Sequence, residues 1–251
     1  MDRPVRAHLG GDRGRERDPY PPVTVNEHHH ADVSGGWLRA ATFGAMDGLV
    51  TNIALIAGVG GGGVDRHTLI LSGVAGLVAG AISMGIGEYT SVSTQNAQVA
   101  AELAKERHEL TVNPEGEAAE LVATWTARGL PVELARQVAD VLKADPEQAL
   151  RVHAQEELGV VPDELPSPWV AAWSSFVCFA VGALIPLISY LAGADSLWLA
   201  LAVGGVGLFV AGAVVGRFTA RPWPVSGLRQ LALGGLAAAA TYGIGVLIAA
   251  A

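Results

Sequence analysis

Apolar residues in this chain are gathered into five blocks, each about 20 residues long. Short polar, glycine-rich or proline-containing turns separate most of the blocks, but a much longer polar segment lies between the second and the third. The blocks are Trp37–Gly60, Thr68–Gly87, Trp169–Ala192, Leu197–Gly216 and Leu228–Ala251. A helix of about 20 apolar residues crosses the roughly 30 Å hydrocarbon core of a bilayer. The pattern therefore predicts an all-α protein with five transmembrane spans.

The second block runs on into polar sequence without a helix-breaking residue. Neither proline nor glycine occurs from Glu88 to Val112, so we expect one helix to leave the bilayer and continue in water. Glutamates recur along this helix four and three positions apart, which places them on one helix face, and a pair after the break at Asn113-Pro114 repeats the three-residue step. They are Glu102, Glu106, Glu109, Glu117 and Glu120. Carboxylates stacked in this way repel one another unless a cation lies between them.

The polar segment that follows has the apolar spacing of soluble amphipathic helices. Proline or aspartate residues mark the starts of three of them. These helices are expected at about 115–129, 131–143 and 146–158. The proline-rich residues 161–168 then lead back to the bilayer. Residues 99–167 are thus predicted to form a small helical domain inserted between spans two and three.

The insert also accounts for the formal net charge of −8. Residues 96–167 hold 14 Asp or Glu against 6 Lys or Arg, and 6 − 14 equals −8. A segment this acidic does not bind nucleic acid by neutralising phosphates. Cys178 is the single cysteine, which excludes a disulfide or a thiolate zinc site within one chain.

Five spans place the two termini on opposite sides of the membrane. If the N-terminus is cytoplasmic, so is the insert, and 15 of the 16 Lys and Arg residues then lie on the cytoplasmic side, with only Arg66 opposite. The positive-inside rule favours this orientation. We therefore expect a cytoplasmic N-terminus and insert, with the C-terminus on the opposite side.

Residues 1–36 are rich in Arg, Asp, Pro and Gly and lack apolar periodicity, so a disordered tail without a cleavable signal peptide is expected. His28, His29 and His30 could touch a metal, although a flexible polar tail is the simpler interpretation. The predicted division of the chain is then tail, spans one and two, insert, and spans three to five. The corresponding ranges are 1–36, 37–98, 99–167 and 168–251.

Three residues of the first two spans carry chemistry that lipid disfavours. Asp47 lies in the middle of the first span, where a carboxylate costs at least about 2.5 kcal/mol on the insertion scale. It either bonds to another helix or lies on a path for ions or protons, and we favour the path. Met84 and Glu88 are four positions apart, so a thioether and a carboxylate share one face of the second span. A lone Met usually serves packing, but together with the two carboxylates it makes a ligand set for a first-row divalent ion.

In the last helix of the insert, His153 and Glu157 are four apart and share a face. Acidic surface helices often serve solubility alone, so a solvated face is the alternative for any single glutamate. The combination of carboxylate pairs with His-x-x-x-Glu favours a metal site instead. Carboxylate and imidazole suit Fe²⁺, Mn²⁺ or Zn²⁺, and the lack of thiolate disfavours Cu(I).

Three motifs occur together in the chain: DGLVTNIALIAGV starting at Asp47, AGAISMGIGEYTSVSTQ starting at Ala79, and an acidic helical insert ending in EELG at Gly159. Over about Gly35–Ala251 this set resembles the vacuolar iron transporter family. The resemblance implies five spans, a cytoplasmic metal-binding domain between spans two and three, and a dimer. It also implies transport of Fe²⁺, often with Mn²⁺, out of the cytoplasm, coupled to inward proton movement.

The resemblance further implies roles for individual residues. Asp47 matches the family's pore aspartate and Met84 its second-span methionine. The metal-binding glutamates of the insert match Glu106, Glu109, Glu117, Glu120 and Glu157. One departure is His153, where the family pattern has a methionine. Imidazole is a harder ligand than a thioether, which leaves the preference among Fe²⁺, Mn²⁺ and Zn²⁺ open.

The predicted function is therefore export of ferrous or manganous ion by proton antiport, in the cell membrane of a prokaryote-like cell. The expected partners are divalent metal ions, protons, the lipid membrane and a second copy of the chain. No resident cofactor is expected, although Zn²⁺ could bind in the insert. The alternative function is a membrane-anchored metal buffer or sensor, but a mere anchor has no use for the intramembrane Asp47.

An enzyme is not expected. A ferritin-like oxidase would need Glu-x-x-His on a bundle helix, and the residue three before His153 is Leu150. The chain also has no nucleotide-binding loop of the Gly-Lys-Ser/Thr kind, which argues against ATP as the energy source.

Overall fold

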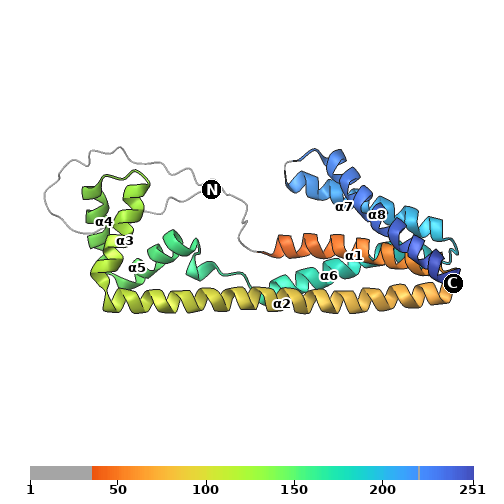
Figure 1. The fold of residues 1–251 in the computed structure, drawn as a ribbon, viewed down its shortest axis with the longest axis horizontal. Coiled ribbons are helices and arrows are strands. Elements are labelled where there is room, and N and C mark those ends of the chain that lie inside the picture. The colour runs from red at the N-terminus through yellow and green to blue at the C-terminus, as the bar shows by residue number, and fades with distance from the viewer. Residues whose placement is uncertain (1–35, 220) are drawn as a thin grey trace, which may run out of the picture. The chain divides into compact units, whose positions relative to one another are not determined.

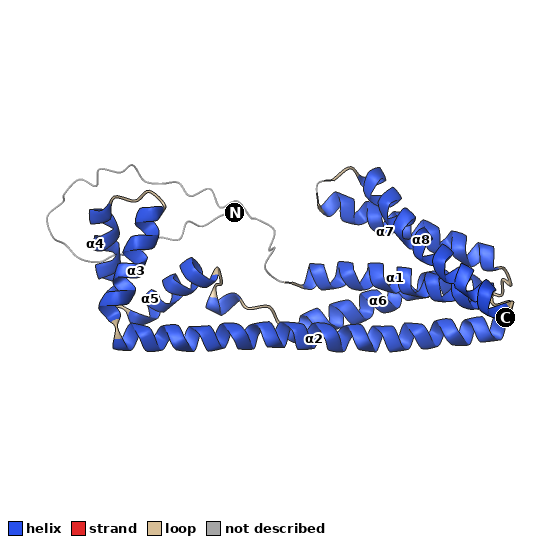
Figure 2. Cartoon of the chain, viewed as in Figure 1, coloured by secondary structure: helices blue, strands red, loops and turns tan. Residues whose placement is uncertain are grey.

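The computed structural model describes residues 36–219 and 221–251, in which every regular element is helical (Figures 1 and 2). The elements are α1 (Trp37–Gly61), α2 (Arg66–Val112), α3 (Pro114–Ala127), α4 (Val132–Lys143), α5 (Pro146–His153), a π-helical turn (Ala154–Leu158), a 3-10 turn (Pro162–Glu164), α6 (Pro168–Leu191), α7 (Leu197–Phe218) and α8 (Trp223–Ala249). The predicted all-α class is confirmed. Apart from Gly36, the predicted tail with His28, His29 and His30 lies outside the described residues.

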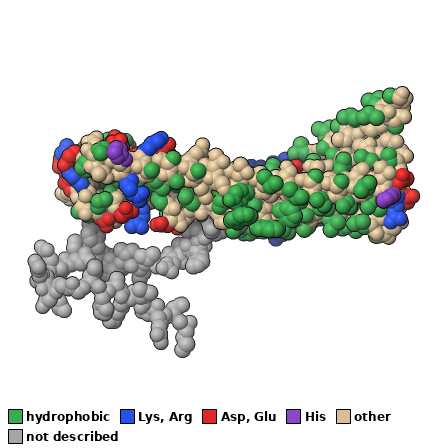
Figure 3. All heavy atoms as spheres, turned by 90° about the horizontal axis from the view of Figure 1, so that it is seen from below, with side chains coloured by type: hydrophobic (Ala, Val, Ile, Leu, Met, Phe, Trp, Pro, Cys, Tyr) green, Lys and Arg blue, Asp and Glu red, His purple; other side chains and the backbone are tan. Residues whose placement is uncertain are grey.

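Five helices in the described part of the chain are long and apolar enough to cross a membrane: α1, α2, α6, α7 and α8. Their surfaces carry large apolar side chains, such as Leu71, Val78 and Ile86 on α2, that water would not tolerate as a continuous patch. Hydrophobic side chains cover the spans in Figure 3, whereas charged side chains gather over the insert. The five-span prediction is therefore confirmed.

Helix α2 joins the spans to the insert without interruption (Figure 1). It has 47 residues. At 1.5 Å per residue it is about 70 Å long, more than twice the roughly 30 Å of hydrocarbon in a bilayer. Its start is fixed by Asp65, whose carboxylate accepts a hydrogen bond from the Thr68 N–H at 2.9 Å. It ends at Asn113-Pro114, because a proline disfavours the helical conformation in the residue that precedes it.

Helices α1 and α6 approach so closely that their backbones touch. A Cβ atom at Gly48 would collide with the carbonyl oxygen of Phe179, and one at Gly44 would lie 2.5 Å from the carbonyl oxygen of Ser175. Both glycines are buried on the same face of α1. Small residues at such positions let membrane helices pack by close contact, which is their main source of association in lipid.

A buried amide supports α6 where a proline interrupts it. Pro186 lies inside α6, and proline both lacks a backbone donor and crowds the carbonyls of the preceding turn. Asn52 of α1 donates from Nδ2 to the carbonyl oxygen of Ala183, one turn before Pro186. The N–H that Pro186 lacks would have served the carbonyl of Gly182, and in a medium without water the amide of Asn52 adds a hydrogen bond to the adjacent carbonyl.

Two helix ends differ from the sequence prediction. Helix α8 begins at Trp223 rather than Leu228, because Pro222 and Pro224 occupy the cap and the first turn, where the missing N–H of proline is not needed. The last helix of the insert widens into a π turn at Ala154–Leu158, which its apolar spacing did not indicate.

We expect Gly48→Ala to destabilise the protein by about 1–3 kcal/mol, because the added methyl group must push α1 away from α6. Thermal unfolding in detergent would measure the loss. Gly235→Ala on α8 is the matched control, since a Cβ there meets no atom within 4 Å. The control should be neutral or slightly stabilising, because Ala favours a helix over Gly. Equal midpoints for the two variants would contradict the close α1–α6 contact.

Candidate metal centre

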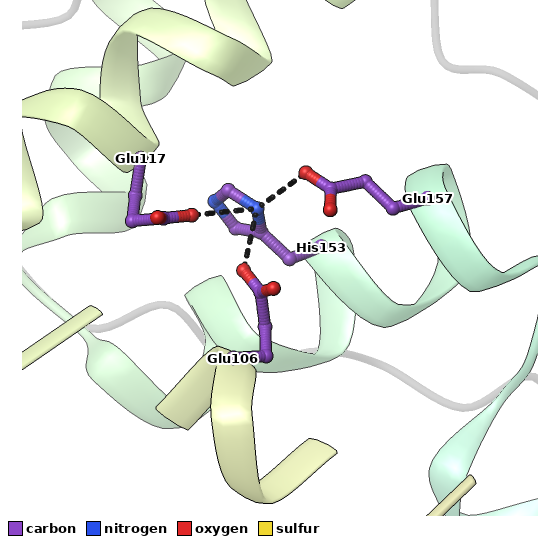
Figure 4. A group of neighbouring side chains, drawn as sticks. All are labelled: Glu106, Glu117, His153 and Glu157. Carbon is purple, nitrogen blue, oxygen red and sulfur yellow. Dashed lines mark hydrogen bonds and ion pairs between the residues drawn. The ribbon is translucent and has the colours of Figure 1, made fainter. Parts of the chain in front are cut away.

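Four side chains of the insert converge on one point (Figure 4). Glu106 comes from α2, Glu117 from α3, His153 from the end of α5 and Glu157 from the π turn. One nitrogen or carboxylate oxygen from each residue lies within 4.8 Å of those of the others. Residues 51 positions apart in the sequence (157 − 106) therefore form one compact group. We call these four residues the carboxylate–histidine cluster.

The imidazole of His153 lies at the centre of the cluster. Its Nδ1 atom is 2.9 Å from Oε1 of Glu106, 3.1 Å from Oε1 of Glu157 and 3.5 Å from Oε2 of Glu117. A single Nδ1–H cannot point at three carboxylates at once. Oε1 of Glu106 is accordingly buried and accepts no hydrogen bond from any described residue.

The reversal of the chain between α2 and α3 brings the first two glutamates together. Asn113 ends α2 and caps α3, because its side-chain oxygen accepts a hydrogen bond from the Gly116 N–H at 3.2 Å. Pro114 follows as the first residue of α3, where proline is favoured. Glu106 lies two turns before this reversal and Glu117 lies in the first turn after it, so the two side chains face each other.

A small apolar core holds His153 in place. Leu121, Leu142 and Ala149 are buried together where α3, α4 and α5 meet. His153 borders a pocket that these residues line, and its side chain is only 1% exposed. The core therefore fixes the imidazole from one side while the carboxylates face it from the other.

Burial and crowding of negative charge change the acidity of the cluster. Burial raises the pKa of Glu117 to about 7, and a hydrogen bond with Glu106 and the charges of Glu106 and Glu120 add to the effect. Burial also raises the pKa of Glu106; the hydrogen bond with Glu117 opposes this rise, and the charges of Glu157, Glu120 and Glu109 support it. The cluster thus holds one carboxyl, that of Glu117, which remains partly protonated near neutral pH.

Six other acidic residues of the insert pair with Lys or Arg, and the three glutamates of the cluster do not. Within residues 36–219 and 221–251, no Lys or Arg forms an ion pair with Glu106, Glu117 or Glu157. The paired acids are Glu102 (Lys105), Glu115 (Lys143), Glu133 (Arg136), Glu147 (Arg107), Glu156 (Arg128) and Asp163 (Arg151). Uncompensated carboxylates beside an imidazole are the ligand types that Fe²⁺, Mn²⁺ and Zn²⁺ accept.

Two of the glutamates that the sequence indicated as ligands lie outside the cluster. Glu109 and Glu120 are both exposed to solvent. Their charges still act on the cluster. Both charges raise the pKa of Glu106, and the charge of Glu120 also raises the pKa of Glu117. The structure therefore places them at the rim of the site rather than among its four converging atoms.

In the membrane region, the sequence-predicted residues have different surroundings. The carboxylate of Asp47 accepts a hydrogen bond from the hydroxyl of Thr51 at 3.3 Å. Met84 packs beside the buried side chain of Phe179 of α6. Glu88 is buried and forms an ion pair with Arg39 of α1, in which the guanidinium Nη2 lies 2.9 Å from Oε2.

Sequence reasoning missed the partner of Glu88 and the partner of Glu156. Arg39 stands two residues after the start of the first apolar block (39 − 37), a position that fits pairing with a carboxylate near the end of the second. Glu156, the neighbour of Glu157, accepts a hydrogen bond from Nε1 of Trp125 at 3.2 Å and pairs with Arg128. No sequence signal links α3 to this glutamate.

Comparison with known proteins matches nearly the whole described chain. The model of the VIT family matches residues 38–246. A protein named vacuolar iron transporter from Acanthamoeba castellanii is 37% identical over 234 residues, which cover 91% of this chain and 85% of that protein. Vacuolar iron transporter 1 of Oryza sativa subsp. japonica is 31% identical, with 87% and 89% covered. Vacuolar iron transporter 1 of Arabidopsis thaliana is 29% identical, with 87% and 90% covered.

The raised pKa of Glu117 makes the stability of the metal-free protein depend on pH. Between the ordinary value of 4.5 and about 7, the folded carboxyl holds a proton that the unfolded chain has released. The free energy of unfolding should therefore fall as the pH rises through this range. Glu117→Gln resembles the protonated form and should lose much of this fall, as thermal midpoints in detergent would show. Glu133 is an exposed glutamate on α4, so Glu133→Gln is the control and should show the pH dependence of the wild type. If Glu117→Gln also kept that dependence, the pKa of Glu117 would be an ordinary one.

Proposed function

The chain belongs to the VIT family, and we propose that it exports Fe²⁺ or Mn²⁺ from the cytoplasm in exchange for protons. A multi-pass membrane protein of a metal transporter family is the premise. Iron as cargo is supported by the names of the relatives, which are vacuolar iron transporters. Manganese is supported by the ligand chemistry, since carboxylates and imidazole suit both ions.

The observation that carries the proposal is the carboxylate–histidine cluster. Three carboxylates without a basic partner among the described residues face one imidazole, and a divalent ion would supply the charge that they lack. In this proposal Glu106, Glu117, His153 and Glu157 bind the ion, while Glu109 and Glu120 attract it from the rim. Because the pKa of Glu117 is about 7, capture near neutral pH would release a proton from this carboxyl.

From the insert, the proposed path follows α2 into the membrane. Glu88 lies on this helix at the end of the apolar block, where Arg39 competes with an ion for its carboxylate. Met84 is one turn deeper, and Asp47 on α1 is the carboxylate in the middle of the first span. We propose that these three residues pass the ion through a pore at a dimer interface, and that protonation of Asp47 resets the path.

We place the N-terminus and the insert in the cytoplasm, in the cell membrane of a prokaryote-like cell. The distribution of Lys and Arg supports this orientation. The relatives are named for vacuoles, and transport into a vacuole or out of a cell moves the ion away from the cytoplasm in either case. The direction is therefore the same in both settings.

We expect Asp47→Asn to abolish metal flux while the protein still folds and assembles, since the amide keeps the size of the side chain but cannot titrate. The measurement is uptake of Fe²⁺ or Mn²⁺ into proteoliposomes that contain a pH-sensitive dye. Asp195→Asn, an exposed residue between α6 and α7, is the matched control and should transport as wild type. Flux without a change of internal pH would argue against antiport, and metal binding without any flux would favour a membrane-anchored buffer.

His153→Met should change the ranking of metals at the insert. Zn²⁺ binds imidazole well, so its affinity should fall more than that of Fe²⁺. Anaerobic titration of the full-length protein in detergent with each metal would measure the ranking. His108→Met, an exposed histidine on α2, is the control and should leave the ranking unchanged. An unchanged ranking in His153→Met would mean that the metal is held by carboxylates alone.

A further inference from the structure

Two adjacent glutamates are close enough in sequence to serve His153, yet only one of them faces it. Glu156 and Glu157 follow His153 by three and four positions. In a regular helix, both spacings place a side chain on the same face as the reference residue. In the structure only Glu157 reaches the imidazole, at 3.1 Å from Nδ1. Something other than helix periodicity therefore selects between the two carboxylates.

Helix α3 takes both oxygens of Glu156. Nε1 of Trp125 donates to Oε1 at 3.2 Å, and Arg128 forms an ion pair with Oε2. The side chain of Glu156 is 20% exposed, so these bonds are made in a partly desolvated place. With both oxygens occupied on the side of α3, Glu156 does not compete for His153.

The backbone of the π turn also separates the two glutamates. Ala154–Leu158 is wound as a π-helix, with more residues per turn than an α-helix, so the side chains after His153 are rotated from their usual positions. Gly159 closes the turn with a φ of 65°, and its N–H donates to the carbonyl of Ala154. A single π turn is a rare local structure that is frequent at functional sites, and here the contacts of Glu156 with Trp125 and Arg128 attach the turn to α3.

We propose that Trp125 and Arg128 are positioning residues of the metal centre, which anchor the π turn to α3 through Glu156 so that Glu157 faces His153. The proposal rests on the proposed function, because it requires the carboxylate–histidine cluster to bind metal. Helix α3 then serves the centre twice, since it also carries the ligand Glu117. Partners that orient a metal ligand in this way commonly change metal affinity by about 10- to 100-fold when they are removed.

The test is calorimetric titration of the full-length, detergent-solubilised protein with Mn²⁺, in which the insert centre is defined as the binding that Glu117→Gln removes. Trp125→Phe keeps the aromatic ring but loses the N–H donor, and Glu156→Ala loses both contacts. Each should weaken the insert centre by about tenfold or more. Glu156→Gln keeps an oxygen that can accept from Trp125, so it should restore most of the affinity. Glu133→Ala removes an exposed glutamate of α4 and should bind as wild type.

The double variant Trp125→Phe/Glu156→Ala should bind no more weakly than Glu156→Ala alone, because both changes remove the same contact. If Glu156 were itself a ligand, Trp125→Phe would free it and binding would become stronger, which would overturn the proposal. Wild-type affinity in both single variants, with Glu117→Gln still inactive in binding, would also overturn it and would leave the metal centre intact. If Glu117→Gln removed no binding, the metal centre and the positioning role would both be wrong.

Discussion

Uncompensated negative charge in a partly buried place is the constraint on which the insert depends. Glu106, Glu117 and Glu157 face a single imidazole, and none of them pairs with a Lys or Arg among residues 36–219 and 221–251. Glu117 is buried, Glu106 half-buried and Glu157 exposed, and crowding such carboxylates costs free energy unless a proton or a cation joins them. The raised pKa of Glu117 means that a proton bound to this carboxyl removes part of the negative charge. The chain reversal at Asn113, the apolar core around Leu121 and the π turn all serve to hold the carboxylates together despite their repulsion.

The same constraint appears again in the membrane, where it is met differently. Glu88 is buried and has the guanidinium of Arg39, whereas in the part of the chain that the structure describes Asp47 has only the hydroxyl of Thr51. A carboxylate with so little compensation in the middle of a span is expensive unless it is used. Helix α2 connects the two environments physically, because it carries Glu106 in the insert and Glu88 in the bilayer region on one rigid element.

Periodicity and composition were enough to predict the spans, the long second helix and the three helices of the insert, because each depends on local sequence. The approach of Glu106 to Glu117 could be predicted from the sequence, since Asn113-Pro114 marks the chain reversal between them. Spacing alone could not decide that Glu109 and Glu120 stay at the rim, because a helix face is broad and the tertiary fold selects within it. The Arg39–Glu88 pair and the contact of Trp125 with Glu156 join residues of different helices, so no local sequence pattern predicts them.

The histidine at the centre has a consequence that a thioether would not have. An imidazole N–H can donate a hydrogen bond to a carboxylate, and Nδ1 of His153 lies 3.1 Å from Oε1 of Glu157. A thioether has no hydrogen to donate. In the metal-free protein, Nδ1–H can therefore occupy the central position that an ion would take and hold the carboxylates around it. For an ion to bind through Nδ1 as proposed, this N–H must be given up or moved to Nε2, so that Nδ1 changes from a hydrogen-bond donor to the carboxylates into a ligand beside them.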